Sequence, residues 1–215
     1  MHYEVMINGT SRSFPGPHKL LSEAATDGDV VILLGNRAGK LLPGLARREQ
    51  RPAVLIELGT ECLGVHTGES RALEGSNVIG FARFRLGDGD PSDLVELVVQ
   101  PGTQPGALAC AKTIFEGAGL QTAVCRDAPG RILDRLLRPF FNAALRRLDE
   151  GLASADDLDT TLKLGLGYPE GPISLLERTG LAEHHDVTQA LYQALGQEAY
   201  APARRAQVGK ARAGR

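Results

Sequence analysis

The sequence predicts an α/β unit with a mostly parallel sheet, followed by an all-α unit. Strand-like and helix-like patterns alternate along the first 128 residues, as in α/β proteins. The runs VVILL and AVLIEL are apolar on both faces, which is typical of parallel strands covered on both sides. From Pro129 onward, apolar residues recur only at helical spacing. We therefore expect units at residues 1–127 and 128–200, and a basic tail at 201–215.

Within the first unit, short apolar runs bounded by turn-forming residues predict the strands. These runs lie at residues 3–7, 29–35, 53–58, 77–84, 94–99 and 121–126. Helical patterns fall between several of them, at residues 18–26, 39–49 and 105–119, and Pro43 interrupts the second of these. The order of elements predicts a sheet with helical crossovers.

The second unit begins with a long amphipathic pattern over residues 130–151, in which Pro139 should produce a kink. Ser154, followed by Asp157, predicts a capped start for the next helix, and Gly165 is its expected end. Residues 171–180 and 186–196 predict at least two further helices. This unit is therefore expected to be a helical bundle.

Composition excludes several classes of protein. A net charge of -2 gives no reason to expect nucleic acid or an anionic membrane as a partner, and no apolar run approaches a membrane-spanning length. The three cysteines lack metal-ligand spacing and indicate a reducing compartment. We expect a soluble, cytoplasmic protein without a metal. The five Lys and Arg residues from Arg204 to Arg215 predict a solvated, mobile C-terminus.

The second unit also carries short motifs in a fixed order. They resemble those of the C-terminal domain of the 3-hydroxyacyl-CoA dehydrogenases, which typically read D-x-P-G-F-x-x-N-R-x-L, P-x-x-N-E-A, E-G-x-A-S-x-x-D-x-D and G-x-G-x-P-x-G-P. The matching residues are Asp127, Pro129, Gly130, Arg135, Leu137, Pro139, Asn142, Ala144, Glu150, Gly151, Ala153, Ser154, Asp157, Asp159, Gly165, Gly167, Pro169, Gly171 and Pro172.

The resemblance extends back into the first unit. NVIGFARF and DLVELVV look like the family's strand pair around V-I-G-x-H-F-F-N-P and L-V-E-V-V, and AVLIELGTECL looks like the strand that carries N-T-S. The implied fold is an abbreviated Rossmann-like domain followed by a helical domain that commonly makes a dimer contact. The implied chemistry, in fatty acid metabolism, is oxidation of a 3-hydroxyacyl-CoA by NAD. In that reaction a histidine base is paired with a glutamate, while Ser and Asn side chains hold the substrate oxygen.

Most of the implied catalytic residues are missing at the matching positions. The family's histidine falls on Ala82, which cannot accept a proton, whereas the glutamate is present as Glu96. The family's asparagine falls on Asp134, an acceptor where an amide donor is needed. N-T-S becomes Gly59-Thr60-Glu61, so Thr60 alone keeps its type. Of the catalytic set, Glu96 stands alone.

The cofactor-binding half is also reduced. The first strand leads into NGTSRSFPGPHK, which has no G-x-G-x-x-G motif, and roughly 60 residues of the family pattern are missing if each crossover needs at least 10–12 residues. The loop GNRAGK, which ends at Lys40, has neither the spacing nor the Ser/Thr of a phosphate-binding P-loop. We therefore expect no cofactor, and NAD only if an active dehydrogenase has survived.

Alternatives remain open for three sets of side chains. His66 is a candidate displaced base, set against a surface-loop histidine. His184-His185 could be read as a metal pair, but adjacent helical residues point about 100° apart, so a solvated helix start is preferred. Glu96 is expected to be a remnant paired with a nearby arginine, for which Arg83 and Arg85 are the candidates.

Two functional hypotheses follow. The first is a non-catalytic member of the family that forms a homodimer through its helical domain. Such a protein would bind an acyl-CoA-like ligand or pair with a catalytic homologue. The second is an active NAD-dependent 3-hydroxyacyl-CoA dehydrogenase with a rearranged site. The matching Gly, Pro and Asp positions specify turns and caps, so they indicate the fold rather than catalysis.

Overall fold

A computed structural model describes residues 2–69 and 75–214 of the chain. It divides into two compact units: an α/β unit, Met1–Phe84 with Pro91–Ile132, and a helical unit, Arg85–Asp90 with Leu133–Arg215. The helical unit thus begins at Leu133 rather than at the predicted residue 128. Residues 127–132 stay with the sheet because they bond to the loop after its third strand. The Asp127 carboxylate accepts from the N–H groups of Leu63 and Gly64, and the Gly130 N–H donates to the Thr60 carbonyl.

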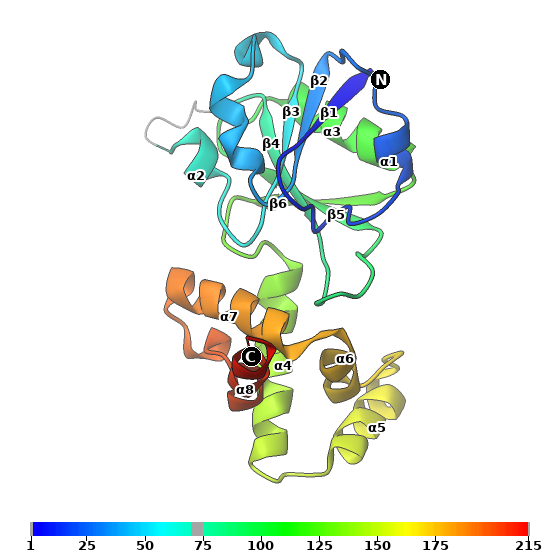
Figure 1. Cartoon of the computed structure of the whole chain (residues 1–215), viewed down its shortest axis with the longest axis vertical. Helices are drawn as coiled ribbons and strands as arrows, with labels where there is room; N and C mark the ends of the chain where they lie inside the picture. Colours follow the sequence, from blue (N-terminus) through cyan, green and yellow to red (C-terminus); the bar gives the residue numbers. More distant parts are fainter. Residues whose placement is uncertain (1, 70–74, 215) are drawn as a thin grey trace. The chain divides into compact units, whose positions relative to one another are not determined.

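The α/β unit is built on a six-stranded sheet (Figure 1). Every neighbouring pair is parallel except β4 and β5, so the prediction of a mostly parallel sheet is confirmed. The strands are β1 (Tyr3–Ile7), β2 (Val30–Leu34), β3 (Val54–Glu57), β4 (Val78–Arg83), β5 (Leu94–Val99) and β6 (Gln121–Arg126).

The spatial order of the strands is simply their order along the chain, β1-β2-β3-β4-β5-β6. In a doubly wound sheet, the strand order reverses at one point, and the ligand crevice opens there at the carboxyl ends of the strands. No such reversal occurs among the described strands. The abbreviated sheet therefore keeps the carboxyl edge at which α/β proteins bind ligands, but not the switch point that opens it.

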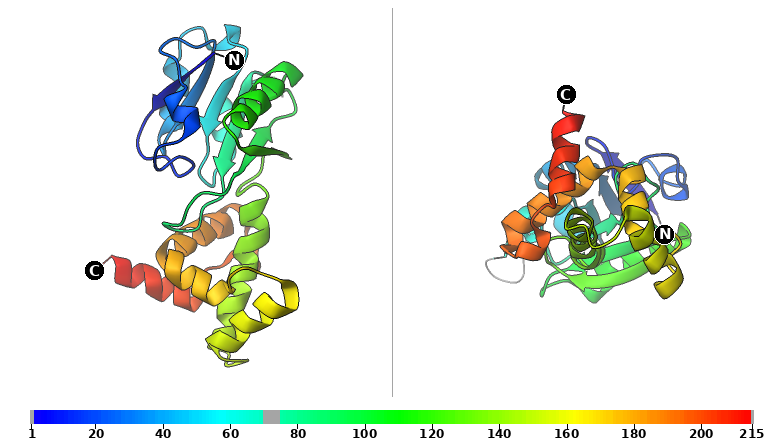
Figure 2. Two further views of the ribbon diagram at one scale, coloured as in Figure 1. Left: turned by 90° about the vertical axis from the view of Figure 1, so that its right-hand side faces the viewer. Right: turned by 90° about the horizontal axis from the view of Figure 1, so that it is seen from below.

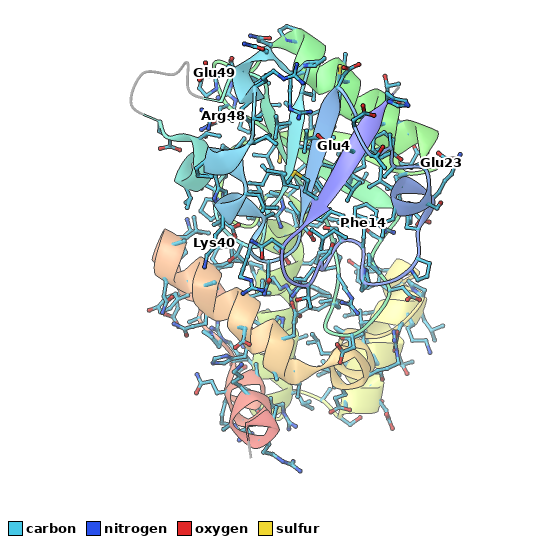
Figure 3. All side chains as sticks on the ribbon, turned by 45° about the horizontal axis from the view of Figure 1, so that its top comes forward. Glu4, Phe14, Glu23, Lys40, Arg48 and Glu49 are labelled. Atoms are coloured by element: carbon cyan, nitrogen blue, oxygen red, sulfur yellow. The ribbon has the colours of Figure 1, made fainter. Side chains whose placement is uncertain are left out.

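Two apolar layers cover the sheet. On one face, the odd-numbered core residues of β4 and β5, including Phe81 and Leu97, pack with Phe14 and with α3 (Pro105–Gly117). Phe14 comes from the loop after β1 (Figure 3). On the other face, Val78 and Val98 pack with short turns between β2 and β3. The alternation of side chains along each strand sends successive residues to opposite layers.

The helices predicted at residues 18–26 and 39–49 are wrong in extent. The first is only α1 (Lys19–Ser22), and the second is three turns of 3₁₀-helix, η1 (Ala38–Lys40), η2 (Leu42–Gly44) and η3 (Arg48–Gln50). Pro43 lies in η2, where the missing N–H and fixed φ favour a turn over a continuous α-helix. A further short helix, α2 (Gly64–Thr67), follows β3.

The helical unit is organised around α4 (Leu133–Asp149), which contacts every other helix of the unit (Figure 2). The others are α5 (Ala155–Leu166), α6 (Pro172–Thr179), α7 (Leu181–Leu195), η4 (Glu198–Tyr200) and α8 (Arg204–Ala213). Pro139 lies inside α4 and leaves the carbonyl of Arg135 without its helical donor. The Tyr200 hydroxyl donates to that carbonyl at 3.2 Å, so a side chain from η4 replaces the missing bond.

Two further predictions for this unit need correction. The mobile basic tail is instead largely α8: Ala206 is fully buried, and α8 packs on α7. Arg215, the last residue of the predicted tail, lies outside the described part of the chain. The helix expected to stop at Gly165 runs to Leu166 and ends at Gly167, whose left-handed φ of 73° suits glycine. No helix in the described residues is long and apolar enough to span a membrane.

The motif residues of the helical unit serve mainly as helix caps. Ser154 caps α5 as predicted, since its hydroxyl accepts from the Asp157 N–H at 3.1 Å. Asp159 caps α6 by accepting from the N–H groups of Ile173 and Ser174 at 2.8 and 2.9 Å. A Cβ at Gly171 would lie 2.1 Å from the Asp159 carboxyl carbon, so this cap requires glycine there.

Candidate functional site

Glu96 faces Ala82 directly across the antiparallel pair of β5 and β4. Both side chains point to the face of the sheet opposite Phe81, and both are buried. The carboxylate therefore lies beside the position at which the resemblance expects its histidine. A methyl group occupies that position and offers no atom to accept or donate a proton.

The charge of Glu96 is instead held by the segment that leaves the sheet. Its Oε1 accepts from the Ile132 N–H at 2.8 Å, and its Oε2 lies 3.4 Å from Nε of Arg131. The side chains of Glu96 and Arg131 are 2% and 5% exposed, so water screens the pair little. A buried carboxylate is costly unless it has a cation and hydrogen bonds, and here Arg131 supplies the cation and the Ile132 N–H supplies a hydrogen bond.

The expected partners of Glu96, Arg83 and Arg85, are thus wrong. Arg83 binds backbone oxygens of the loops instead, donating to the carbonyls of Ser92 and Ser13 at 2.8 and 2.9 Å. Successive side chains of a strand point to opposite faces of the sheet, so Arg83 points away from the face that carries Ala82 and Glu96. Arg85 belongs to the helical unit and donates to the Gly89 carbonyl at 2.7 Å.

Arg131 is the residue of this site that sequence reasoning missed. It stands where the family motif D-x-P-G-F has phenylalanine, and that exchange of an aromatic for a cation was the available signal. Its backbone φ is 54°, in the left-handed region, and its Nη1 donates to the Gly59 carbonyl at 2.7 Å. The turn at residues 127–132 therefore directs a guanidinium back onto the sheet.

Asp134 begins a buried polar cluster in the helical unit. Its Oδ1 accepts from Nε of Arg138 at 2.8 Å, and Arg138 is fully buried. The guanidinium of Arg138 also reaches both oxygens of Glu183, at 3.2 and 3.3 Å. At the family's asparagine position, the carboxylate is therefore bound to an arginine one helical turn away. Among the described contacts, the Asp134 carboxylate is the acceptor of an ion pair with Arg138.

His184 closes the same cluster, so its expected solvated position was wrong. The side chain is fully buried, with Nε2 3.0 Å from Oδ1 of Asn142 and Nδ1 3.2 Å from Nη1 of Arg138. The Asn142 amide donates to the carbonyls of Ala199 and Ala201, so its oxygen accepts from Nε2–H of the imidazole. Burial, reinforced by the charge of Arg138, lowers the pKa of His184 to about 3. His184 is therefore a neutral structural residue.

The carboxyl edge of the sheet is occupied by a second acid, Glu57 at the end of β3. Its carboxylate accepts from the N–H of Ser13 at 2.8 Å and from the N–H of Gly35 at 2.7 Å, and the Ser11 hydroxyl donates to it at 3.0 Å. These N–H groups belong to the loops after β1 and β2. In a dinucleotide-binding unit, the amides after the first strand face the pyrophosphate. Here they are bound to a carboxylate of the chain itself.

The loops after β1 and β2 are also bonded to each other. The N–H groups of Asn36 and Arg37 donate to the carbonyls of Thr10 and Asn8. A Cβ at Gly35 would lie 2.3 Å from the Asn8 carbonyl oxygen, which shows how closely the two backbones approach. The residues at this edge therefore do not fit the pyrophosphate of NAD, and the GNRAGK loop has no free run of amides to act as a P-loop.

Thr60 and His66 occupy the loop and short helix after β3. The described contact of Thr60 is through its carbonyl, which accepts from Gly130. His66 lies in α2 with its Nε2 3.3 Å from Oε1 of Glu61. Burial alone would raise the pKa of Glu61, but the hydrogen bonds from His66 and from the Gly59 N–H outweigh it, so the pKa is lowered. Among the described residues, no cluster of His, Cys, Asp or Glu could hold a metal.

Comparison with known proteins agrees with the motif evidence. Residues 130–215 match the family model for the 3-hydroxyacyl-CoA dehydrogenase C-terminal domain. Human mitochondrial hydroxyacyl-coenzyme A dehydrogenase is 40% identical over 88 residues, which cover 41% of this chain and 28% of that protein. A 3-hydroxybutyryl-CoA dehydrogenase of Bradyrhizobium diazoefficiens is 33% identical over 110 residues, covering 51% of this chain and 38% of that protein. The matched segments thus span about a third of these relatives.

Solved structures share the fold over more of the chain. The (S)-3-hydroxybutyryl-CoA dehydrogenase of Ralstonia eutropha superposes with a TM-score of 0.71 at 24% identity, covering 89% of this chain and 70% of that one. The Escherichia coli 3-hydroxybutyryl-CoA dehydrogenase superposes with a TM-score of 0.70 at 23% identity, covering 86% of this chain and 41% of that one. The helical unit thus matches the C-terminal domain of the 3-hydroxyacyl-CoA dehydrogenases in sequence, and the chain shares its fold with solved 3-hydroxybutyryl-CoA dehydrogenases.

Proposed function

We propose that this chain is a non-catalytic member of the 3-hydroxyacyl-CoA dehydrogenase family. The observation that carries the proposal is the pair of replacements around Glu96: alanine at the position of the base, and Arg131 on the carboxylate. A glutamate that orients a histidine must have a histidine to orient, and one neutralised by an arginine no longer raises the basicity of a neighbour. Glu96 therefore serves to hold the turn at residues 131–132 against the sheet.

The carboxyl edge of the sheet supports the same proposal. Glu57 fills the amide sites of the loops after β1 and β2, and those loops are tied together by backbone hydrogen bonds. NAD is the hydride acceptor of the family reaction, and without a binding site for its pyrophosphate it is not held in position to accept the hydride. The fluorescence of NADH should therefore not change when the protein is titrated into it. Saturable binding of NADH with micromolar affinity would contradict the proposal.

We further propose that the helical unit forms a homodimer, as the motifs of that unit imply. Within this unit, Asp159 is the one buried residue of α5. Leu164 and Leu166 are 83% and 66% exposed, and Leu152 and Tyr168 extend the apolar surface on either side of the helix in sequence. A second copy of the chain would cover this surface, and large exposed apolar groups of this kind mark interaction sites.

Light scattering across a dilution series tests the dimer. The wild-type protein should have the mass of two chains, and Leu164→Glu/Leu166→Glu should have the mass of one. Val208→Glu is the control, because it places one such charge on a partly exposed apolar residue of α8 in the same unit. It should remain a dimer. A wild-type monomer at every concentration, or a charged α5 variant that stays dimeric, would contradict this part of the proposal.

The ligand expected for this function is an acyl-CoA or a related thioester. A thermal shift that rises with ligand concentration, as mass action requires, would support binding. A flat response to CoA, acetyl-CoA and longer acyl-CoAs would remove the ligand and leave pairing with a homologue as the role of the dimer surface.

The second candidate is an active dehydrogenase with a rearranged site, and one observation favours it. His66 and Glu61 form an imidazole–carboxylate pair, which is the type of pair missing at Ala82 and Glu96. His66→Asn separates the two candidates. Dehydrogenase turnover that is present in the wild type and lost in this variant would favour the rearranged site over the non-catalytic protein.

A further inference from the structure

A pocket of about 370 Å³ opens at the carboxyl ends of β1, β2 and β3. This is the edge at which open α/β sheets bind ligands, and the volume falls within the range of small-molecule sites. Its walls come from the loop after β1, from the segment Gly35–Lys40 and from the loop after β3. The charged and titratable residues of its lining are Arg12, Arg37, Lys40, Glu57, Glu61 and His66.

The charges in this pocket are unequal. Arg12, Arg37 and Lys40 bring three cations, against the carboxylates of Glu57 and Glu61. Glu57 is already bound by two backbone N–H groups, and Glu61 by His66. Arg37 and Lys40 are exposed and form no ion pair with any described residue. The carboxylates of the pocket therefore do not neutralise Arg37 and Lys40.

The backbone adds little to recognition here. The N–H groups of Gly35, Asn36 and Arg37 are bonded to Glu57, Thr10 and Asn8. A ligand must therefore be recognised by side chains rather than by a cradle of amides. A volume of about 370 Å³ lies at the lower end of the range for small-molecule sites, so the pocket suits a compact ligand.

His66 forms a fixed wall of the pocket. Its ring lies against η1 so closely that a Cβ at Gly39 would be 2.3 Å from Nδ1, and Glu61 holds its other nitrogen. The imidazole can therefore contact a ligand without first having to be ordered. Lys40 lies at the end of the segment after β2, well separated from Arg48 on η3 (Figure 3).

We propose that this pocket binds a small organic phosphate through Arg37 and Lys40. A phosphate monoester carries a charge of about -1.5 to -2 at neutral pH and several acceptor oxygens, which matches a guanidinium and an ammonium left without anions. The planar fork of an arginine binds two phosphate oxygens at once, and the lysine supplies a compact second charge. The inference concerns a different site from Glu96 and does not rest on the absence of dehydrogenase activity.

Isothermal titration calorimetry with the full chain tests the proposal. The probes are inorganic phosphate, glycerol 3-phosphate, CoA and NADH at low ionic strength. Glycerol 3-phosphate should bind with saturable heat, and the affinity should fall at least tenfold in Arg37→Gln/Lys40→Gln. CoA carries its own phosphomonoester, so binding of CoA that falls equally in the variant would identify CoA as the source of the phosphate.

Arg48→Gln/Lys112→Gln is the matched control, since it removes one arginine and one lysine from the same unit outside the pocket. It should bind the probes as the wild type does. Arg37 and Lys40 are exposed, Arg48 and Lys112 are partly exposed, and a circular dichroism melt confirms that both variants fold. No saturable heat with any phosphate probe, an equal loss in the control, or unchanged binding by Arg37→Gln/Lys40→Gln would overturn the proposal. So would NADH binding more tightly than the monoesters.

Discussion

The two units of this chain treat the family's residues in opposite ways. In the helical unit, the motif residues Ser154, Asp159 and Gly171 are present and perform the backbone task that their types predict. In the α/β unit, Glu96 is present, but Ala82 lies opposite it where the resemblance expects a histidine, and Arg131 pairs with its carboxylate. A helix cap needs one acceptor side chain and the backbone of the helix, whereas a catalytic pair needs two specific side chains. A fold can therefore be retained while the residues of a catalytic pair change.

Arg131→Met should have the largest effect on stability. It leaves the buried Glu96 carboxylate without its cation, and breaking one half of a buried ion pair costs about 3–5 kcal/mol. Urea unfolding should show a loss of about 3 kcal/mol in the free energy of unfolding. The double variant Glu96→Gln/Arg131→Met should recover part of that loss, because no uncompensated charge remains. A single variant within 0.5 kcal/mol of the wild type would show that the pair does not hold the turn.

Asp159→Ala should have the next largest effect, in the other unit. It removes the acceptor for two backbone N–H groups at the start of α6, so we expect a loss of about 2 kcal/mol in urea unfolding. Asp156→Ala is the matched control, since this aspartate lies on the same helix but is exposed. It should cost about 0.5 kcal/mol. Equal losses in the two variants would contradict the assignment of Asp159 as the cap.

The pH dependence of the helical unit should reflect His184. Its pKa is about 3 when folded and near 6.5 when unfolded, so the unfolded state binds the extra proton as the pH falls below 6.5. Stability from this residue is therefore complete above pH 6.5 and is lost as the pH falls toward 3. The slope is at most about 1.4 kcal/mol per pH unit. Urea unfolding at several pH values should give a steeper slope for the wild type than for His184→Gln, and identical slopes would contradict a buried neutral imidazole.

Sequence patterns predicted the elements well wherever local signals decide. The apolar runs located six strands, and the Ser154 cap was predicted from its hydroxyl and the following acid. The short turns after β2 were missed because their apolar spacing also suits a helix, and only Pro43 argued against it. The C-terminal helix was missed because its one fully buried residue, Ala206, is too small to show as an apolar stripe.

Predictions that required a partner distant in sequence were less successful. The position of Ala82 opposite Glu96 could be expected from two aligned strands. The pairing of Glu96 with Arg131, 35 positions away, depends on a turn with a left-handed residue that periodicity does not reveal. His184 appeared to start a helix because its buried partners, Asn142 and Arg138, lie on another helix.

The most direct test of the central claim is the rate of NADH oxidation with acetoacetyl-CoA at high protein concentration. We expect no turnover above the protein-free rate in the wild type. We expect the same in Ala82→His, because Arg131 would still hold Glu96 and the loop amides would still hold Glu57. Turnover by the wild-type protein that is lost in Glu96→Gln would contradict the claim, since it would show that the carboxylate still takes part in catalysis.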